Sequence, residues 1–370
     1  MNARGFVKRH RALRWVAPIG IAGAAALTAS GVLTAHAAPT RLPRTTPTSL
    51  LAQVQSTHMT GFTGTVVSHL SLGLPQLPDL GTTGDGTSLP SLLTGSHTMQ
   101  VWYGGITKQR IALLGTTDEN DLFRDGRQLW EWDSANRSAV HTVLPNAAQS
   151  APSAAPTSAA ASLTPEQLAK RLLDKMDPTT KVQVKGHGSV ADRSTYEVVL
   201  TPRSRTRIGS VHIAIDGQTK MPLAVRVYAR GASHPAIDVG FTSISYGTPS
   251  QRNFAFRPPP GAHVRTVHHH SPHHGTSTGG HSTSRSATRP SDVHVLGSGW
   301  ARVLTARVPQ TWVHNADRSP VLQALTPVNG TWGTGRLLDS SLVTVLITND
   351  GRVFTGAVDP SVLYAAAGTK

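Results

Sequence analysis

Residues 124–132 of this chain read RDGRQLWEW, a stretch that predicts a tight β-hairpin. The pair Asp125-Gly126 supplies the positive φ angles that a two-residue type I′ turn requires. Such a loop sets Phe123 opposite Gln128, and side chains alternate between the two faces of a strand. One face of the hairpin is therefore expected to carry Phe123, Gln128, Trp130 and Trp132. Large aromatic side chains in a row either fill a core or meet an apolar ligand.

The hairpin resembles the DG-x-x-x-W-x-Y/W hairpin of the LolA-type lipoprotein carriers. Three later segments resemble other parts of that family in the same order. They are the strand 196–202 (YEVVLTP), the long hairpin 222–246 and the closing segment 253–264 (NFAFRPPPGAHV). The resemblance implies an α+β fold in which a strongly curved antiparallel sheet forms a half-open barrel with a helical lid.

Hydrophobic periodicity predicts the same class from the residues alone, because long alternating strands outnumber two short helices. One helix is expected at 49–56. A second is expected after the N-cap Thr164, with Pro165 at the first helical position and Gln167 completing a capping box. The expected strands are 62–70, 99–103, 109–114, 122–123, 128–132, 140–144, 182–185, 195–200, 211–216, 223–229 and 236–246.

The first 37 residues are expected to be an export signal. Five basic residues and no acidic residue precede an apolar run from Trp15 to Leu33, and Ala35-His36-Ala37 offers a cleavage site. An uncleaved membrane anchor is the alternative, since the run is long enough to span a bilayer. The chain has no cysteine, which excludes a disulfide and a lipid-modified cysteine. We therefore expect an exported, extracytoplasmic protein.

The mature chain is expected to contain two domains. A leader (38–48) precedes a LolA-like lipid-binding domain (49–264), which is interrupted by an insertion loop (72–97) and a low-complexity loop (146–162). A His-rich linker (265–290) leads to a small C-terminal α+β domain (291–370). In that domain we expect strands at 342–347 and 352–355 and a helix at 360–367, with Asp359 as its N-cap.

The formal net charge of +15 falls to about +10 when the five basic residues of the signal are removed. This surplus suits peripheral contact with an anionic membrane or cell-wall surface. The basic residues are dispersed, so a merely solvated surface is the other interpretation. Nucleic acid is not an expected partner, because the protein is exported and has no recognisable reader motif.

The sequence predicts no catalytic residues, metal site or cofactor. Residues 275–279 (GTSTG) match Gly-x-Ser-x-Gly but lack the strand and helix that a nucleophile elbow requires. Six histidines lie close together in the predicted linker: His268, His269, His270, His273, His274 and His281. They are either a weak chelator of divalent transition metals or part of a neutral flexible spacer.

The resemblance implies non-enzymatic binding of acyl chains or lipoproteins in an apolar cavity. The predicted lining is Val66, Val101, Phe123, Trp130, Trp132, Val198, Val211, Ile213, Ile215, Val225 and Val227. The predicted lid consists of Leu50, Leu51, Val54, Leu168, Leu172 and Met176. Arg110 is the nearest match to the carriers' lid-holding arginine, although the proline expected before it is missing. Alternation alone does not distinguish a lining residue from a core residue.

Two other functions stay open. A carrier-like domain followed by a smaller one resembles the RseB/MucB family, whose members bind a membrane-anchored anti-sigma factor. The third alternative is a structural protein that keeps the fold and fills its cavity with its own side chains. Export is compatible with all three.

Overall fold

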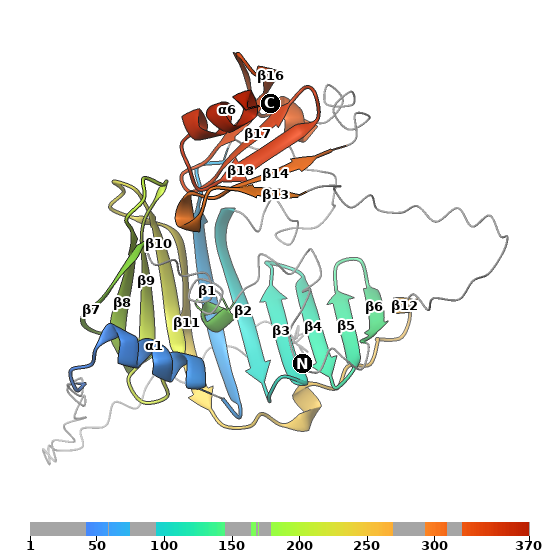
Figure 1. Ribbon diagram of the computed structural model, residues 1–370. Helices are drawn as coiled ribbons and strands as arrows, with labels where there is room; N and C mark the ends of the chain where they lie inside the picture. The colour runs from blue at the N-terminus through green and yellow to red at the C-terminus, as the bar shows by residue number, and fades with distance from the viewer. Residues whose placement is uncertain are drawn as a thin grey trace, which may run out of the picture. The chain divides into compact units, whose positions relative to one another are not determined.

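The computed structural model describes residues 42–57, 59–74, 94–144, 164–167, 169, 179–268, 293–308 and 320–369. They form a twelve-stranded sheet and a separate six-stranded sheet with few helices (Figure 1). The predicted signal, the loop 146–162, most of the insertion and most of the His-rich linker lie outside the described residues. No described helix is long and apolar enough to cross a membrane.

The large sheet is antiparallel except for one pair, and its order is β12-β6-β5-β4-β3-β2-β1-β11-β10-β9-β8-β7. Its strands are β1 (Phe62–Ser71), β2 (Thr94–Tyr103), β3 (Lys108–Leu114), β4 (Glu119–Asp125), β5 (Gln128–Asp133), β6 (Ser138–Val143), β7 (Thr180–Val190), β8 (Arg193–Pro202), β9 (Ile208–Asp216), β10 (Pro222–Ala229), β11 (Pro235–Tyr246) and β12 (His263–His268). The order begins and ends on different strands, so the described strands form an open sheet and not a closed barrel.

The second sheet has the order β13-β14-β18-β17-β16-β15. Its elements are β13 (His294–Leu296), η4 (Gly299–Ala301), β14 (Val303–Arg307), α5 (Pro320–Gln323), β15 (Thr326–Gly330), β16 (Gly333–Asp339), β17 (Thr344–Thr348), β18 (Arg352–Gly356) and α6 (Pro360–Gly368). Leu363 of α6 packs against Leu346 and Phe354 of the sheet. Asp359 occupies the N-cap position of α6, but its side chain makes no capping hydrogen bond.

The β4–β5 hairpin has a different register from the predicted one. Phe123 pairs with Trp130, and Asp125 pairs with Gln128, so the loop is Gly126-Arg127 and not Asp125-Gly126. Only the first loop residue has a positive φ angle, 61° at Gly126, as in a type II′ turn. The shift of two residues is even, and Phe123, Trp130 and Trp132 therefore still share a face.

Replacing Gly126 with Ala should lower the free energy of unfolding by about 1–2 kcal/mol. A Cβ atom at this position meets no atom within 4 Å, so the cost comes from the left-handed backbone and not from a clash. Chemical denaturation of the variant measures this cost. A stability equal to the wild type would contradict the assigned turn.

Two predicted segment boundaries are wrong because backbone pairing extends beyond the local sequence pattern. The insertion was expected to run to residue 97, but β2 begins at Thr94, which pairs with Ser71 of β1. The linker was expected to begin at residue 265, but β12 (His263–His268) adds to the edge of β6. Prolines and histidines give no local sign of such pairing.

The helix starts follow the capping residues. The helix α1 (Pro47–Ser56) begins after Thr46, whose hydroxyl accepts a hydrogen bond from the amide of Ser49. The predicted capping box is confirmed, because the amide of Gln167 donates to Thr164 Oγ1 at 3.3 Å and the Gln167 side chain accepts from the Thr164 amide at 3.2 Å. The predicted lid residues Leu168, Leu172 and Met176 lie outside the described residues.

Candidate apolar binding site

Strand pairing assigns each predicted lining residue to one of two faces, because directly paired residues share a face. We define the inner face as the one that carries Val198, Ile213 and Val225, which pair in series across β8, β9 and β10. Val225 pairs with Val239 of β11, and the same face continues through Phe241, which pairs with Val66 of β1. Eight of the eleven predicted lining residues lie on the inner face: Val66, Val101, Val198, Val211, Ile213, Ile215, Val225 and Val227.

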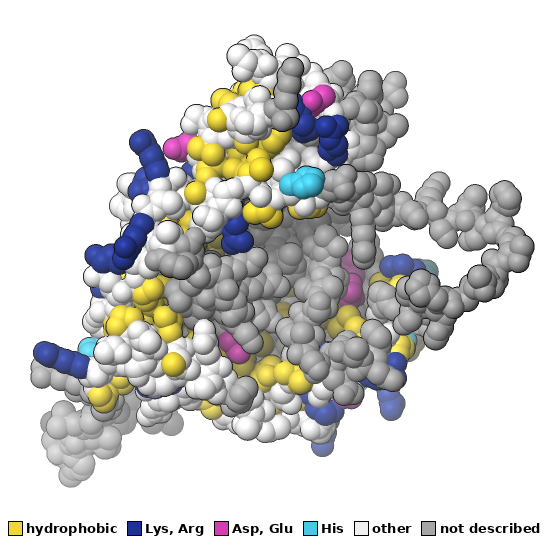
Figure 2. All heavy atoms as spheres, viewed as in Figure 1, with side chains coloured by type: hydrophobic (Ala, Val, Ile, Leu, Met, Phe, Trp, Pro, Cys, Tyr) yellow, Lys and Arg dark blue, Asp and Glu magenta, His cyan; other side chains and the backbone are white. Residues whose placement is uncertain are grey.

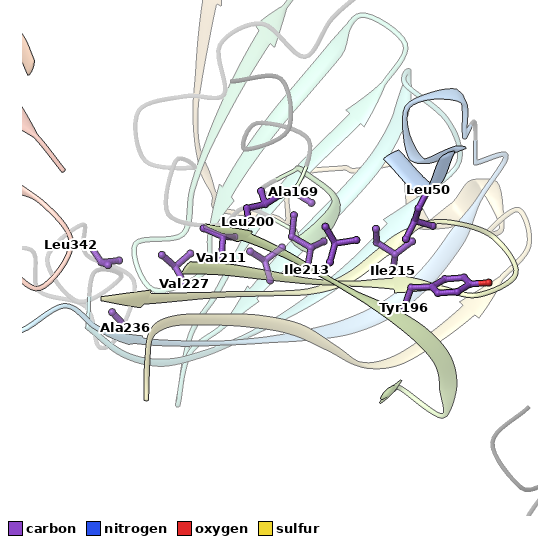
Figure 3. Packing of buried hydrophobic residues seen from close by; sticks show 12 residues of the cluster. Leu50, Ala169, Tyr196, Leu200, Val211, Ile213, Ile215, Val227, Ala236 and Leu342 are labelled. Carbon is purple, nitrogen blue, oxygen red and sulfur yellow. The ribbon is translucent and has the colours of Figure 1, made fainter. Parts of the chain in front are cut away.

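The helix α1 covers part of the inner face. Leu50 is fully buried and belongs to the same apolar cluster as Tyr196 and Ile215. Figure 3 shows Leu50 projecting from α1 toward Ile215, with Val211, Ile213 and Val227 continuing the row. Leu51 and Val54 are half-buried and pack against the same cluster. The three predicted lid residues of this helix therefore meet the inner face.

Few polar bonds hold this cover in place. The Tyr196 hydroxyl donates to the carbonyl oxygen of Pro43 at 3.0 Å, before α1 begins. After α1 ends, Thr57 Oγ1 donates to the Thr219 carbonyl at 3.3 Å. Between these two bonds, the contacts recorded for α1 and the inner face are apolar.

The helix that begins at Thr164 also approaches the inner face. Ala169 is buried in the same cluster as Leu50. Burial, and then the charge of Glu166, raises the pKa of Tyr103, which lies beside Phe62 of β1. The described part of this helix therefore lies near strands on both sides of β11.

The aromatic row of the hairpin lies on the opposite, outer face. Phe123 pairs with Arg110, and Arg110 pairs with Trp102, whereas the neighbouring residues Leu122 and Ile111 pair in line with Val101. The prediction that Phe123, Trp130 and Trp132 line the same cavity as the valines is therefore wrong. Alternation relates side chains within one hairpin, but the long-range register decides which row shares a face with the residues beneath α1.

The outer aromatic row is covered by Phe256, a residue of the segment that resembles the end of the LolA-type carriers and not one of the predicted lining residues. Its ring stacks on Phe123 at 4.7 Å and lies 5.5 Å from Trp130 and 5.8 Å from Trp132. His141 stacks on Trp130 at 4.1 Å. The motif NFAFRPPPG contains this aromatic residue, but no local sequence pattern predicts which strands its ring contacts.

Arg110 does not act as the predicted lid holder, because it points to the outer face. Its guanidinium lies 4.5 Å from the Trp102 ring and 4.7 Å from the Phe123 ring. Its Nε donates to Asp121 at 3.0 Å and its Nη2 donates to Glu119 at 3.0 Å. The guanidinium therefore stabilises the outer aromatic row by cation–π contact and ion pairing.

Asp121 should make the folded protein more stable in mild acid. Burial raises the pKa of Asp121 from 3.8 to about 6, against the hydrogen bond and charge of Arg110. The pKa of Asp121 is higher in the folded state than in the unfolded state. The resulting stabilisation is therefore complete below about pH 4 and is lost as the pH rises through 6. We expect the wild type to gain about 2 kcal/mol relative to Asp121→Asn between pH 7 and pH 4.

Chemical denaturation of both proteins at the two pH values tests this expectation. A constant difference in the free energy of unfolding between wild type and variant would show that Arg110 offsets burial. A difference that moves in the opposite direction would show that Arg110 outweighs burial.

A small polar depression also lies on the outer face. It has a volume of about 140 Å³ and includes Thr195, Glu197, His212 and Arg226 among its lining. His212 Nδ1 lies 2.8 Å from Glu197 Oε1. Among the described residues, no group of three or more His, Asp or Glu side chains is arranged to hold a metal ion. The depression is too small and too polar for an acyl chain.

Lys and Arg side chains are spread over the visible surface and do not form one patch (Figure 2). This distribution fits the dispersed basic residues of the sequence.

No family model matches the chain, and no curated protein matches it. Similar solved structures include a chain of the Pseudomonas aeruginosa MucA/MucB complex, at 14% identity and a TM-score of 0.42, covering 86% of this chain and 95% of that one. A LolA-superfamily protein from Nitrosomonas europaea is 12% identical, with a TM-score of 0.20. The match covers 58% of this chain and 99% of that one. The motifs of the sequence resemble the second of these groups, and its two-domain layout resembles the first.

Proposed function

We propose that this chain is a non-enzymatic extracytoplasmic binder of acyl chains or acylated proteins, with its site on the inner face beneath α1. One observation carries the proposal: eight predicted lining residues share one apolar face, and a helix with three apolar residues covers part of it. Burial of hydrocarbon is worth about 25 cal/mol per Å², so a long chain binds such a face without directional contacts.

Binding requires α1 to move. Val198, Ile213 and Val225 are fully buried, and Leu50 is part of the cluster that buries them. An acyl chain that takes the place of Leu50, Leu51 and Val54 exchanges one apolar contact for another. The exchange leaves the apolar area of the sheet covered, and its main cost is therefore the loss of α1 docking.

Native mass spectrometry of the purified mature protein tests the proposal. We expect adducts of lipid mass, and one-to-one rebinding of a long-chain fatty acid after delipidation. A protein that is folded, carries no adduct and does not bind the fatty acid at micromolar concentration would exclude an acyl-binding role. It would favour a structural protein whose inner face is only a core.

A regulatory sensor of the RseB/MucB kind is the second candidate, and one observation favours it. Arg207, which precedes β9, joins the large sheet to the second one: its amide donates to the Ala357 carbonyl at 2.8 Å, and its guanidinium pairs with Asp339 at 2.6 Å. In this function the second sheet is the platform for a membrane-anchored partner. Deleting residues 291–370 would then abolish partner capture.

A further inference from the structure

The chain segment 254–268, which we call the return segment, crosses the outer face and ends at the sheet edge. Its first anchor is Phe256, whose ring lies among Phe123, Trp130 and Trp132. Aromatic pairs at these centroid separations stabilise a contact beyond the area that they bury. The aromatic row therefore receives the ring of Phe256 from a distant part of the sequence, while Arg110 and His141 of the same sheet contact Phe123 and Trp130.

The second anchor is the strand β12. It pairs in parallel with β6, from His263 opposite Ser138 to His268 opposite Val143, whereas the other recorded pairs of the large sheet are antiparallel. Its side chains contribute little packing, since residues 263–266 are exposed and Val264 is 51% exposed. Backbone pairing therefore provides most of the attachment of β12.

Polar contacts fix the register between the two anchors. Arg137 Nη2 donates to the Pro260 carbonyl at 2.7 Å, and the His263 amide donates to the Arg137 carbonyl at 2.8 Å. Arg265 pairs with Val140, which is the cross-strand neighbour of Glu131. Burial raises the pKa of Glu131, and the charge of Arg265 opposes that rise. Arg265 therefore shares a face with the carboxylate of Glu131, whose charge it complements.

The geometry points to a peptide-binding site formed by the β6 edge, Arg137 and the pocket of Phe123, Trp130 and Trp132, which the return segment occupies in cis. Strand addition with a side-chain anchor is a general mode of peptide recognition, in which backbone bonds provide affinity and pockets provide specificity. The partner that fits is an extended polypeptide with an aromatic anchor and a basic residue at the spacing of Phe256 and Arg265. The aromatic anchor of this site lies on the outer face, opposite the acyl site, whereas Arg265 at the β6 edge shares the inner-face row of Val140 and Glu131.

Occupation in cis keeps the site closed in the free protein. A tethered segment has a high effective concentration, so an external peptide of equal intrinsic affinity competes poorly with it. Weakening the return segment should therefore open the site to a peptide in trans.

The test uses the full mature chain with Phe256→Ala, Thr266→Pro and Val267→Pro combined. Adjacent residues of a strand point their amides to opposite sides, so one of the two prolines must remove a donor to β6. The probe is a fluorescent peptide of residues 252–268, and its matched control carries Ala in place of Phe256. We expect the variant to bind the probe at least about tenfold more tightly than the wild type does, and the control peptide to bind about tenfold more weakly than the probe.

A variant that keeps the wild-type circular dichroism spectrum and does not bind the probe overturns the proposal. So does a variant that binds probe and control equally. If the variant does not fold, hydrogen exchange of the wild type tests the proposal instead. We expect the amides of β12 to exchange at least about tenfold faster than those of β5, through local opening. Equal protection of β12 and β5 would show that the return segment is a permanent part of the sheet.

Discussion

Replacing Asp216 with Asn lowers the free energy of unfolding by about 3–5 kcal/mol at neutral pH. The Asp216 side chain is 1% exposed and accepts hydrogen bonds from Arg193, from the amides of Gln218 and Thr219, and from the Tyr246 hydroxyl. An asparagine keeps the shape but leaves the Arg193 charge without its carboxylate. It also turns an amide donor toward groups that are themselves donors.

Asp238→Asn is the matched control, because Asp238 pairs with Arg226 where both side chains are about one-third exposed. We expect a loss of less than about 1 kcal/mol there. Urea denaturation of both variants measures the difference. Equal losses at the two sites would contradict the assigned role of the Asp216 network.

The difference in the free energy of unfolding between the wild type and Asp216→Asn should become smaller in acid. Burial by itself raises the pKa of Asp216, but the hydrogen bonds from Arg193, the two amides and Tyr246 hold it below its usual value. A lowered folded-state pKa gives stability that is present above the unfolded value of about 3.9 and is lost as the pH falls below it. Burial, together with the Asp216 charge, also raises the pKa of Tyr246 to about 12. A difference unchanged between pH 7 and pH 3 would contradict this account.

Replacing Leu50 with Ala should release α1 without unfolding the sheet. Leu50 is fully buried against the inner face, and a buried Leu→Ala change costs about 2–5 kcal/mol. If α1 is a lid, the substitution weakens the docking of α1 on the sheet and does not destabilise the sheet itself. The amides of residues 48–56 should then exchange on the order of a hundredfold faster, whereas those of β8 and β9 change little.

Leu51→Ala is the matched control for Leu50→Ala, since Leu51 is half-buried on the same helix. Its effect on exchange should be clearly smaller. If the amides of α1, β8 and β9 accelerate together in Leu50→Ala, α1 is an integral part of the core and the lid assignment is wrong.

Local patterns were sufficient to predict most elements of the fold. Alternation located β1 to β11 and the pair β17 and β18, but not β12 to β16. The capping residues Thr164 and Gln167 located a helix start that the structure bears out. The predicted antiparallel sheet with few helices and the separate small C-terminal sheet are both present. These features depend on residues close together in the sequence.

The candidate site depends on register and could be predicted only in part. The shift of the hairpin loop to Gly126-Arg127 preserved its faces, but no local pattern linked Phe123 to Val101 across β3 and β2. The valine rows were therefore grouped correctly with one another and wrongly with the aromatic row. The contact of Phe256 with Phe123 joins residues far apart in sequence, and it is equally invisible to periodicity.

Photo-crosslinking with a diazirine-labelled long-chain fatty acid tests the central claim most directly. Bound beneath α1, the label should attach to peptides that contain residues 47–56 and to those from β8 and β9, which carry Val198 and Ile213 on the inner face. Excess unlabelled fatty acid should abolish that labelling. Absence of specific labelling, or labelling confined to the outer aromatic row around Trp130 and Trp132, would contradict an acyl site on the inner face.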